Sequence, residues 1–293
     1  MEISVATRKA NFGLIIMAPI ETISSKMQSI QISGNKSATI TWLDQGDGLP
    51  LFILPSLGRG PADYDYLADL LVARGLRVLR PFPRGIGGSL GVMQGLNLFD
   101  LAGDIAAIIK AMELGPVAVA GHAYGNFVAR ALATGWPELV RGVALVAASA
   151  GKTPDGSSLY AADVLHAVYH SGNMELPEEE RRRHLELAFF APGNDPSPWL
   201  EGWHAETKAM QKEAQSATSI DDFFGCGSAP VLDLQAQEDT VAPRSLAGFL
   251  RESLGERVTV QVIANAGHAL IPEQPVAVSD ALAAWVHRLH NIV

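Results

Sequence analysis

Two side chains near the carboxyl-terminal end of the chain could move protons together. Asp239 follows the apolar run Val231–Leu234, and His268 follows the apolar run Val258–Ile263. A carboxylate that accepts a hydrogen bond from an imidazole fixes its tautomer, so the other ring nitrogen can serve as a general base. Taken singly, Asp239 would be a turn residue and His268 a packed or surface histidine. Their joint placement at strand ends predicts instead that they form a catalytic pair.

A third segment has the form of a turn that presents a nucleophile, but it lacks the nucleophile. The apolar run Val117–Ala120 leads into Gly121–Gly125, which reads Gly-His-Ala-Tyr-Gly, and a helical pattern follows. Two glycines at this spacing allow a strained strand-to-helix turn that lifts its central side chain above a sheet. The central residue is Ala123, whose methyl group cannot attack a carbonyl carbon.

Together these segments resemble the α/β-hydrolase fold superfamily. The turn Gly121–Gly125 is similar to its G-x-S-x-G nucleophile elbow with alanine in place of serine, and the order of elbow, acid and histidine is that of the fold. The run Leu51–Gly58 is similar to the strand and oxyanion loop of the family, with Pro-Ser where His-Gly is usual. The segment Arg84–Ser89 resembles the family's Arg-Gly-x-Gly-x-Ser turn, whose role is structural. The resemblance covers about residues 37–290.

The resemblance implies a role for each residue around the elbow. His268, Asp239 and Ala123 would occupy the positions of base, acid and nucleophile. The backbone N–H groups of Leu57 and Tyr124 would form an oxyanion hole, which is a pair of donors aimed at developing negative charge.

Five other side chains need an interpretation. Ser56, in the oxyanion loop, could supply a displaced hydroxyl, although a loop serine more often bonds its own backbone. His122 is expected beneath the site. Trp199 and Trp203 could bind the substrate or hold their own segment together. Asp233 lies inside an expected strand and needs a hydrogen-bond partner if it is buried.

The elbow and the aromatic segment Phe189–Ser197 resemble a bacterial subgroup of the superfamily in which alanine also stands in the elbow. Ala123 has three explanations. It is a natural residue beside a His–Asp pair that acts on water or substrate, a serine replaced to trap a substrate, or the mark of a protein that only binds a ligand. The resemblance favours the natural alanine.

The apolar pattern predicts the elements that position these residues. Short β-rich runs alternate with helical runs, which is typical of an α/β fold with a mostly parallel twisted sheet and helices on both faces. The expected strands are Ser37–Leu43, Leu51–Leu54, Val78–Pro81, Val117–Ala120, Val143–Ala147, Val231–Leu234 and Val258–Ile263. The expected helices, with apolar residues at i, i+3 and i+4, are Asp63–Ala73, Leu98–Met112, Gly125–Ala133, Arg244–Leu254 and Pro275–His290.

The alternation stops over residues 152–228, where short helical stretches carry many aromatic side chains. We expect this insertion to form a helical cap over the carboxyl-terminal edge of the sheet. Residues 29–151 and 229–293 would then form the α/β-hydrolase core. Residues 1–28 are expected to be a flexible leader rather than a signal peptide, because their apolar run is short and Pro19 interrupts it.

Composition limits the classes of partner. The 293 residues carry a formal net charge of −9, which argues against nucleic acid because phosphate binding needs a concentrated basic face. No apolar run approaches the roughly 18 residues that span a bilayer. The single cysteine, Cys226, cannot form an internal disulfide. We expect a cytoplasmic protein without nucleic-acid or membrane partners, and a homodimer stays open.

The motifs of cofactor and metal sites are missing from the sequence. There is no H-E-x-x-H pattern or Cys/His cluster, and no G-x-G-x-x-G follows the first expected strands. We therefore expect a small-molecule substrate and no cofactor or metal. Hydrolysis of a small apolar ester, lactone or related acyl compound, with water activated by His268, is the leading hypothesis. A His–Asp lyase, a cofactor-free oxygenase and a non-catalytic binding protein are the alternatives.

Overall fold

One mixed sheet forms the centre of the computed structural model, which describes residues 24–153 and 161–291. Within those residues the sheet has nine strands in the order β1-β2-β4-β3-β6-β7-β8-β9, and β5 pairs with β2. The strands are β1 (Lys26–Ile32), β2 (Ala38–Gln45), β3 (Leu49–Leu54), β4 (Leu76–Pro81), β5 (Leu90–Gly91), β6 (Val117–His122), β7 (Val140–Val146), β8 (Val231–Ala236) and β9 (Val258–Ile263).

Most neighbouring strands run parallel. β2 pairs antiparallel with β1, β4 and β5, whereas each pair from β4 through β3, β6, β7 and β8 to β9 is parallel. Parallel neighbours need long crossovers, which helices usually supply on the faces of the sheet. The predicted α/β fold with a mostly parallel sheet is confirmed.

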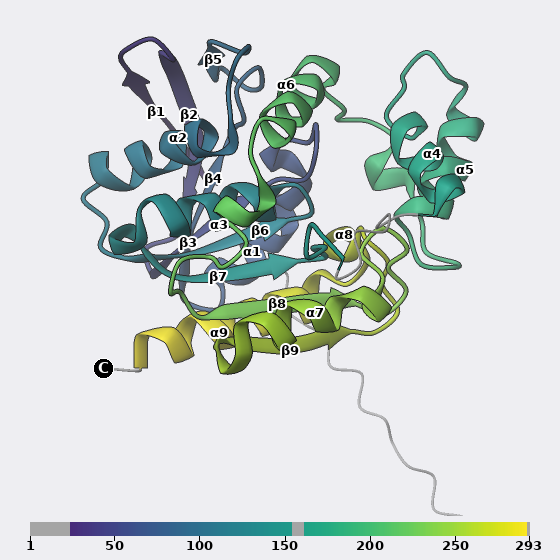
Figure 1. Ribbon diagram of the computed structural model, residues 1–293. Coiled ribbons are helices and arrows are strands. Elements are labelled where there is room, and N and C mark those ends of the chain that lie inside the picture. Colours follow the sequence, from purple (N-terminus) through teal and green to yellow (C-terminus); the bar gives the residue numbers. More distant parts are fainter. Residues whose placement is uncertain (1–23, 154–160, 292–293) are drawn as a thin grey trace, which may run out of the picture.

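Helices cover both faces of the sheet (Figure 1). Outside the segment between β7 and β8 they are α1 (Asp65–Val72), α2 (Leu98–Ala111), α3 (Gly125–Gly135), α7 (Arg244–Leu254), α8 (Leu270–Glu273) and α9 (Pro275–Asn291). α1 packs with α9 over one cluster of buried apolar side chains, and α2 packs with α3 over another. Among the helices in the described ranges, none is long and apolar enough to cross a membrane.

Three α-helices occupy the described residues between β7 and β8. They are α4 (Ala162–His170), α5 (Glu178–Ala188) and α6 (Ala205–Ser216). α4 and α5 pack against each other on the side toward which the parallel strands point (Figure 1). A third apolar cluster joins Phe189 and Trp199 of this segment to Val241 and Ala269 in the loops after β8 and β9. The segment is therefore helical where the sequence predicts a cap.

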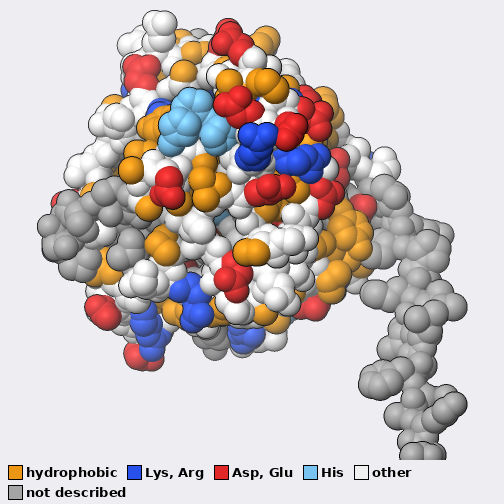
Figure 2. All heavy atoms as spheres, turned by 90° about the vertical axis from the view of Figure 1, so that its right-hand side faces the viewer, with side chains coloured by type: hydrophobic (Ala, Val, Ile, Leu, Met, Phe, Trp, Pro, Cys, Tyr) orange, Lys and Arg blue, Asp and Glu red, His pale blue; other side chains and the backbone are white. Residues whose placement is uncertain are grey.

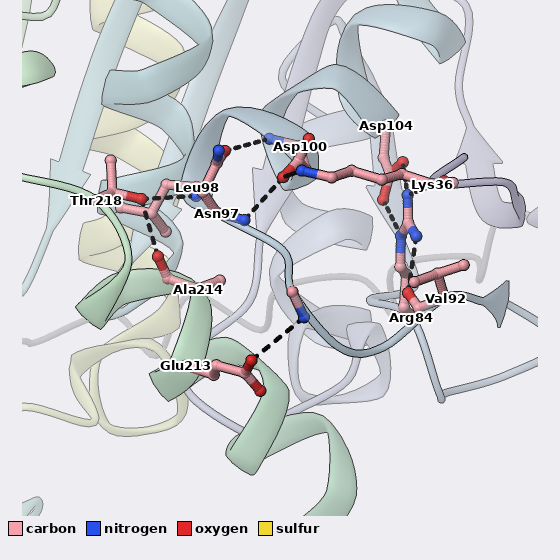
Figure 3. A network of polar contacts seen from close by, with 11 residues as sticks. Lys36, Arg84, Val92, Asn97, Leu98, Asp100, Asp104, Glu213, Ala214 and Thr218 are labelled. Carbon is pink, nitrogen blue, oxygen red and sulfur yellow. Dashed lines mark hydrogen bonds and ion pairs between the residues drawn. The ribbon is translucent and has the colours of Figure 1, made fainter. Parts of the chain in front are cut away.

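α6 returns from this segment to the core, where polar contacts tie it to the start of α2 (Figure 3). The Glu213 carboxylate accepts a hydrogen bond from the Gly95 N–H at 3.2 Å, and the Thr218 hydroxyl accepts one from the Leu98 N–H at 2.9 Å. The Thr218 hydroxyl itself donates to the Ala214 carbonyl at 2.8 Å. These contacts fix the carboxyl-terminal end of α6 on the core.

The turn that begins at Arg84 is stabilised by a buried ion pair. Arg84 donates from Nε and Nη2 to the two carboxylate oxygens of Asp104 at 2.7 and 2.8 Å. It also donates to the carbonyl oxygens of Val92 and Lys36 (Figure 3). A buried charge needs such complete pairing to be tolerated, and the arrangement accounts for a structural role of this turn.

All the strands expected from the sequence are present, with bounds that differ by at most three residues. Two strands were not expected, namely β1 and the two-residue β5. β1 begins at Lys26, so the end of the expected leader at residues 1–28 lies inside a strand. Residues 1–23 of that leader lie outside the described residues.

Histidine side chains gather on the outer face of the α4–α5 pair, beside acidic and basic side chains (Figure 2). The rings of His166 and His170 stack with centroids 4.0 Å apart, and His184 lies 5.4 and 5.5 Å from them. In the described parts of the chain, no group of three or more His, Cys, Asp or Glu side chains is arranged to hold a metal ion. The histidines are therefore a surface cluster.

Asp233 is a buried carboxyl group inside β8. Its side chain accepts a hydrogen bond from Gln235 Nε2 at 2.7 Å, which is the partner that its burial requires. Burial raises the pKa of Asp233 from 3.8 to about 6, and this outweighs the opposing effects of Gln235 and Arg130. The folded protein therefore binds the Asp233 proton more tightly than the unfolded chain does. The stability that the protonated carboxyl group contributes is lost as pH rises through about 6.

We expect Asp233→Asn to raise the free energy of unfolding by about 1–3 kcal/mol at pH 8 and to leave it nearly unchanged at pH 4. The amide stays neutral at both values, whereas the wild-type carboxyl group must ionise in a buried place at pH 8. Urea unfolding of both proteins at the two pH values measures the change. The exposed Asp280→Asn serves as control, and an equal gain at both pH values would contradict the assignment.

Candidate active site

The turn at residues 121–125 has the geometry of a strand-to-helix elbow. β6 ends at His122, α3 begins at Gly125, and Ala123 between them has a φ of 47°. This left-handed conformation costs a residue with a Cβ about 1–2 kcal/mol. Asn126 supports it, because its backbone N–H donates to the Ala123 carbonyl at 3.1 Å and its side-chain amide donates to the same oxygen.

The two glycines of the elbow allow backbone segments to approach each other closely. A Cβ on Gly121 would lie 2.4 Å from the carbonyl carbon of Gly125, and a Cβ on Gly125 would lie 2.3 Å from the carbonyl oxygen of Leu54 in β3. Neither distance leaves room for a side chain. Close packing therefore requires glycine at both positions. This requirement does not involve the side chain of Ala123, so the elbow forms without a serine hydroxyl.

His268 and Asp239 are in hydrogen-bond contact, as the sequence predicts. His268 Nδ1 lies 3.0 Å from Oδ2 and 3.2 Å from Oδ1 of Asp239, and both side chains are buried. Asp239 Oδ1 also accepts from the N–H groups of Val241 and Ala242 at 2.8 and 2.7 Å. Because Nδ1 is bonded to Asp239, Nε2 is the ring nitrogen left for chemistry.

A chain of buried hydrogen bonds connects the loop after β3, the elbow and His268. The Ser56 N–H donates to the Tyr64 hydroxyl at 3.0 Å, and this hydroxyl donates to His122 Nδ1 at 3.0 Å. His122 Nε2–H donates in turn to the His268 carbonyl oxygen at 2.9 Å. Burial, with a smaller effect of His268, lowers the pKa of His122 to about 3. His122 thus supports the site as a neutral ring.

Two backbone N–H groups at the site have no hydrogen-bond acceptor among the described residues. They belong to Leu57, in the loop after β3, and to Tyr124, which follows Ala123. Free N–H groups of this kind can bind the negative charge that develops on a carbonyl oxygen during attack. The Tyr124 hydroxyl, by contrast, donates to the Gln211 carbonyl at 2.8 Å.

A cavity of about 390 Å³ brings most of the expected site residues together. Its wall includes Ala123, His268, Leu57, Tyr124, Ser56 and Trp203. Three expected residues are not in this wall. Asp239 lies behind His268, whose Nδ1 it contacts at 3.0 Å. His122 lies beneath the elbow, and Trp199 is 1% exposed and packs 5.2 Å from Phe189 and 5.8 Å from His122, measured between ring centroids. Trp199 therefore packs between the elbow and the segment that joins β7 to β8.

The sequence pattern that describes the alpha/beta hydrolase family matches residues 51–281, a span that contains the elbow, Asp239 and His268. The chain belongs to the alpha/beta hydrolase family. An esterase from Exiguobacterium antarcticum, 18% identical, has a TM-score of 0.72 with this chain, covering 89% of it and 100% of the esterase. At that identity the likeness shows the fold alone.

This alpha/beta hydrolase matches nearly the whole length of its curated relatives. The chain is 25% identical to a non-heme chloroperoxidase of Streptomyces lividans over 271 residues, which is 87% of this chain and 98% of the relative. It is 24% identical to the (E)-2-((N-methylformamido)methylene)succinate hydrolase of Acinetobacter baylyi over 265 residues, which is 88% of this chain and 97% of the relative. Because both relatives are enzymes, they support the general conclusion that this chain is an enzyme.

The cavity of this alpha/beta hydrolase has polar residues that the sequence analysis did not predict. Lys208, Lys212 and Gln215 of α6 are in its wall. Their spacing of four and three residues places them on one face of a helix, which is the signal that could have found them. Tyr64 was also missed, because its partners Ser56 and His122 come from other segments and no local pattern shows them.

We expect Tyr64→Phe to lower the free energy of unfolding by about 2–4 kcal/mol. The change leaves the Ser56 N–H and His122 Nδ1 buried without partners, and each such group costs ~1–3 kcal/mol. Urea unfolding followed by circular dichroism measures the loss. Tyr66→Phe, at a ring that is 55% exposed, is the matched control and should change stability by less than about 0.5 kcal/mol. Equal losses would show that the Tyr64 hydroxyl is not a structural link.

Proposed function

We propose that this alpha/beta hydrolase cleaves a small ester, lactone or related acyl compound that is largely apolar around its reacting carbonyl. The observation that carries the proposal is that His268, bonded to Asp239, lines the same cavity as Ala123 and two residues with free N–H groups. A base and a pair of oxyanion donors are the groups that acyl transfer to water requires. The hydrolase among the relatives is in keeping with this reaction.

In the proposed reaction, water takes the place of the serine hydroxyl. The Ala123 methyl leaves free the space in which a serine would carry Oγ. His268 Nε2 accepts a proton from water as the water oxygen bonds to the carbonyl carbon, and the N–H groups of Leu57 and Tyr124 bind the oxyanion. When the intermediate collapses, the bond to the leaving alkoxide breaks and the alkoxide takes the proton from His268.

The lack of a serine does not remove the rest of the catalytic arrangement. Serine proteases without one member of their triad keep roughly 10³–10⁴-fold acceleration from binding and the oxyanion hole. A general base contributes a further ~10²–10⁴-fold. Water attack with His268 as base can therefore support slow but real turnover.

We expect the protein to hydrolyse short-chain aryl esters or lactones, and we expect this activity to be lost toward acid pH. The rate of hydrolysis should fall about 10²–10⁴-fold in His268→Ala. The base must be unprotonated to accept a proton from water, so protonation of His268 stops the reaction. His122 cannot cause this profile, because its lowered pKa of about 3 lies below the window of pH 5 to 9 that is measured. The measurement is kcat/KM from pH 5 to 9, with His287→Ala, an exposed histidine of α9, as control.

A second readout separates hydrolysis from the alternatives. In heavy-oxygen water, hydrolysis places one labelled oxygen in the acid product, whereas a lyase places none and an oxygenase takes its oxygen from O₂. Bound probe without product would favour a binding protein. A rate that is flat from pH 5 to 9, or equal in His268→Ala, would remove His268 as the base.

We expect Ala123→Ser to create a reactive serine. The elbow would hold the new Oγ in the wall of the cavity that contains His268, so a fluorophosphonate should bond to Ser at this position and form a stable adduct. Intact-protein mass spectrometry measures the adduct. The same substitution in a His268→Ala background should label at least about 100-fold more slowly. Labelling of Ser56 in the unsubstituted protein would instead reveal a displaced nucleophile.

A further inference from the structure

Two lysines of α6 line the proposed catalytic cavity. Lys208 and Lys212 are four residues apart, so their side chains leave the same face of the helix, and both are half-buried. The same cavity contains Ala123 and His268. A ligand that fills it therefore meets the elbow and two ammonium groups.

These ammonium groups have no carboxylate partner among the described residues. Lys208 Nζ lies 3.4 Å from the carbonyl oxygens of Val168 and Tyr169, near the carboxyl-terminal end of α4. Lys212 Nζ lies 3.8 Å from the centre of the Tyr169 ring. An ammonium group has three N–H donors, so these contacts leave at least one donor of each lysine for a ligand.

The charges of the cavity contrast with those of the whole protein. The chain has a net charge of −9, yet no aspartate or glutamate is among the described residues that line the cavity. The surface lysines Lys36 and Lys152 each pair with an aspartate. At Lys208, burial and then the charge of Lys212 lower the pKa, which means that the two lysines repel each other and an anion would relieve the repulsion.

We propose that the substrate carries a carboxylate that Lys208 and Lys212 bind while its ester or acyl carbonyl lies beside Ala123. This proposal rests on the proposed hydrolysis and names its substrate class, which is a half-ester or related acyl derivative of a dicarboxylic acid. The acid product would then carry two carboxylates.

The position of α6 supports a role in recognition. Gly58 in the oxyanion loop donates from its N–H to the Gln211 side chain at 2.7 Å, and the His204 N–H donates to the Gly58 carbonyl at 2.9 Å. The helix that carries the lysines is thus bonded to the loop that carries the Leu57 N–H. The anion site and the reacting carbonyl are consequently held at a fixed separation.

Binding is tested first without turnover, using pairs of aryl-substituted carboxylates of increasing chain length and their neutral amides. Trp203 lines the cavity, so its fluorescence can report binding, with calorimetry as a check. The best carboxylate should bind at least about tenfold more tightly than its matched amide. If no carboxylate exceeds its amide, or if the matched phosphate binds more tightly, the proposal is overturned.

Variants then locate the anion site. Lys208→Met and Lys212→Met should each weaken carboxylate binding about tenfold and change amide binding less than twofold. Lys212→Arg, which keeps the charge, should keep most of the preference. Lys110→Met removes one exposed positive charge on α2 and controls for the net charge of the protein. A preference for the carboxylate that survives the double Lys208→Met, Lys212→Met substitution would place the anion elsewhere and overturn the proposal.

Turnover of half-esters separates this proposal from the proposed hydrolysis. Carboxylate-selective binding without hydrolysis would contradict the hydrolytic function and leave the anion site standing. Hydrolysis of neutral esters as fast as that of the matched half-esters would support the hydrolytic function and overturn the anion site. In the expected case the two lysine substitutions raise KM for the half-ester about tenfold each and change kcat little, because they remove contacts to the carboxylate and not to the reacting carbonyl.

Discussion

The buried chain from the Ser56 N–H through Tyr64 and His122 to the His268 carbonyl is the constraint on which the rest of the site depends. Its members come from the loop after β3, the turn before α1, the end of β6 and the loop after β9. Inside the protein the low dielectric strengthens such bonds and makes an unmade bond costly. The loop after β3, the elbow and His268 are therefore held together by directional contacts as well as by packing.

The same chain allows only one arrangement of protons. The His268 carbonyl oxygen can only accept, so the neutral ring of His122 carries its proton on Nε2, and its Nδ1 must accept the Tyr64 proton. A second proton on Nδ1 would remove the acceptor of the buried Tyr64 proton, and burial already lowers the pKa of His122 to about 3. His122 in the elbow is thus structural, whereas His268, whose ring centroid lies 5.9 Å from that of His122, is the candidate base.

Local patterns predicted the elements and the contact between Asp239 and His268, but most contacts between distant segments have no local pattern. The strand Val258–Ile263 has the predicted bounds because its apolar run and flanking turns are local features. Asp239 and His268 could be paired because parallel strands place their carboxyl ends at one edge. The strand Lys26–Ile32 was missed because an edge strand pairs on one side only, and its exposed and half-buried residues alternate without an apolar run. Lys208 resembles any surface lysine until the packing of its helix is known.

The conformation of Ala123 shows that the elbow is imposed by its surroundings and not by the chemistry of a serine. Contacts at two glycines and two hydrogen bonds from Asn126 hold a left-handed residue that carries a Cβ, although the conformation costs about 1–2 kcal/mol. His268 and the free N–H groups of Leu57 and Tyr124 consequently lie in one cavity with a methyl group. Whatever occupies the space beside that methyl decides the reaction, and under the proposed anion site Lys208 and Lys212 decide which molecule is brought to it.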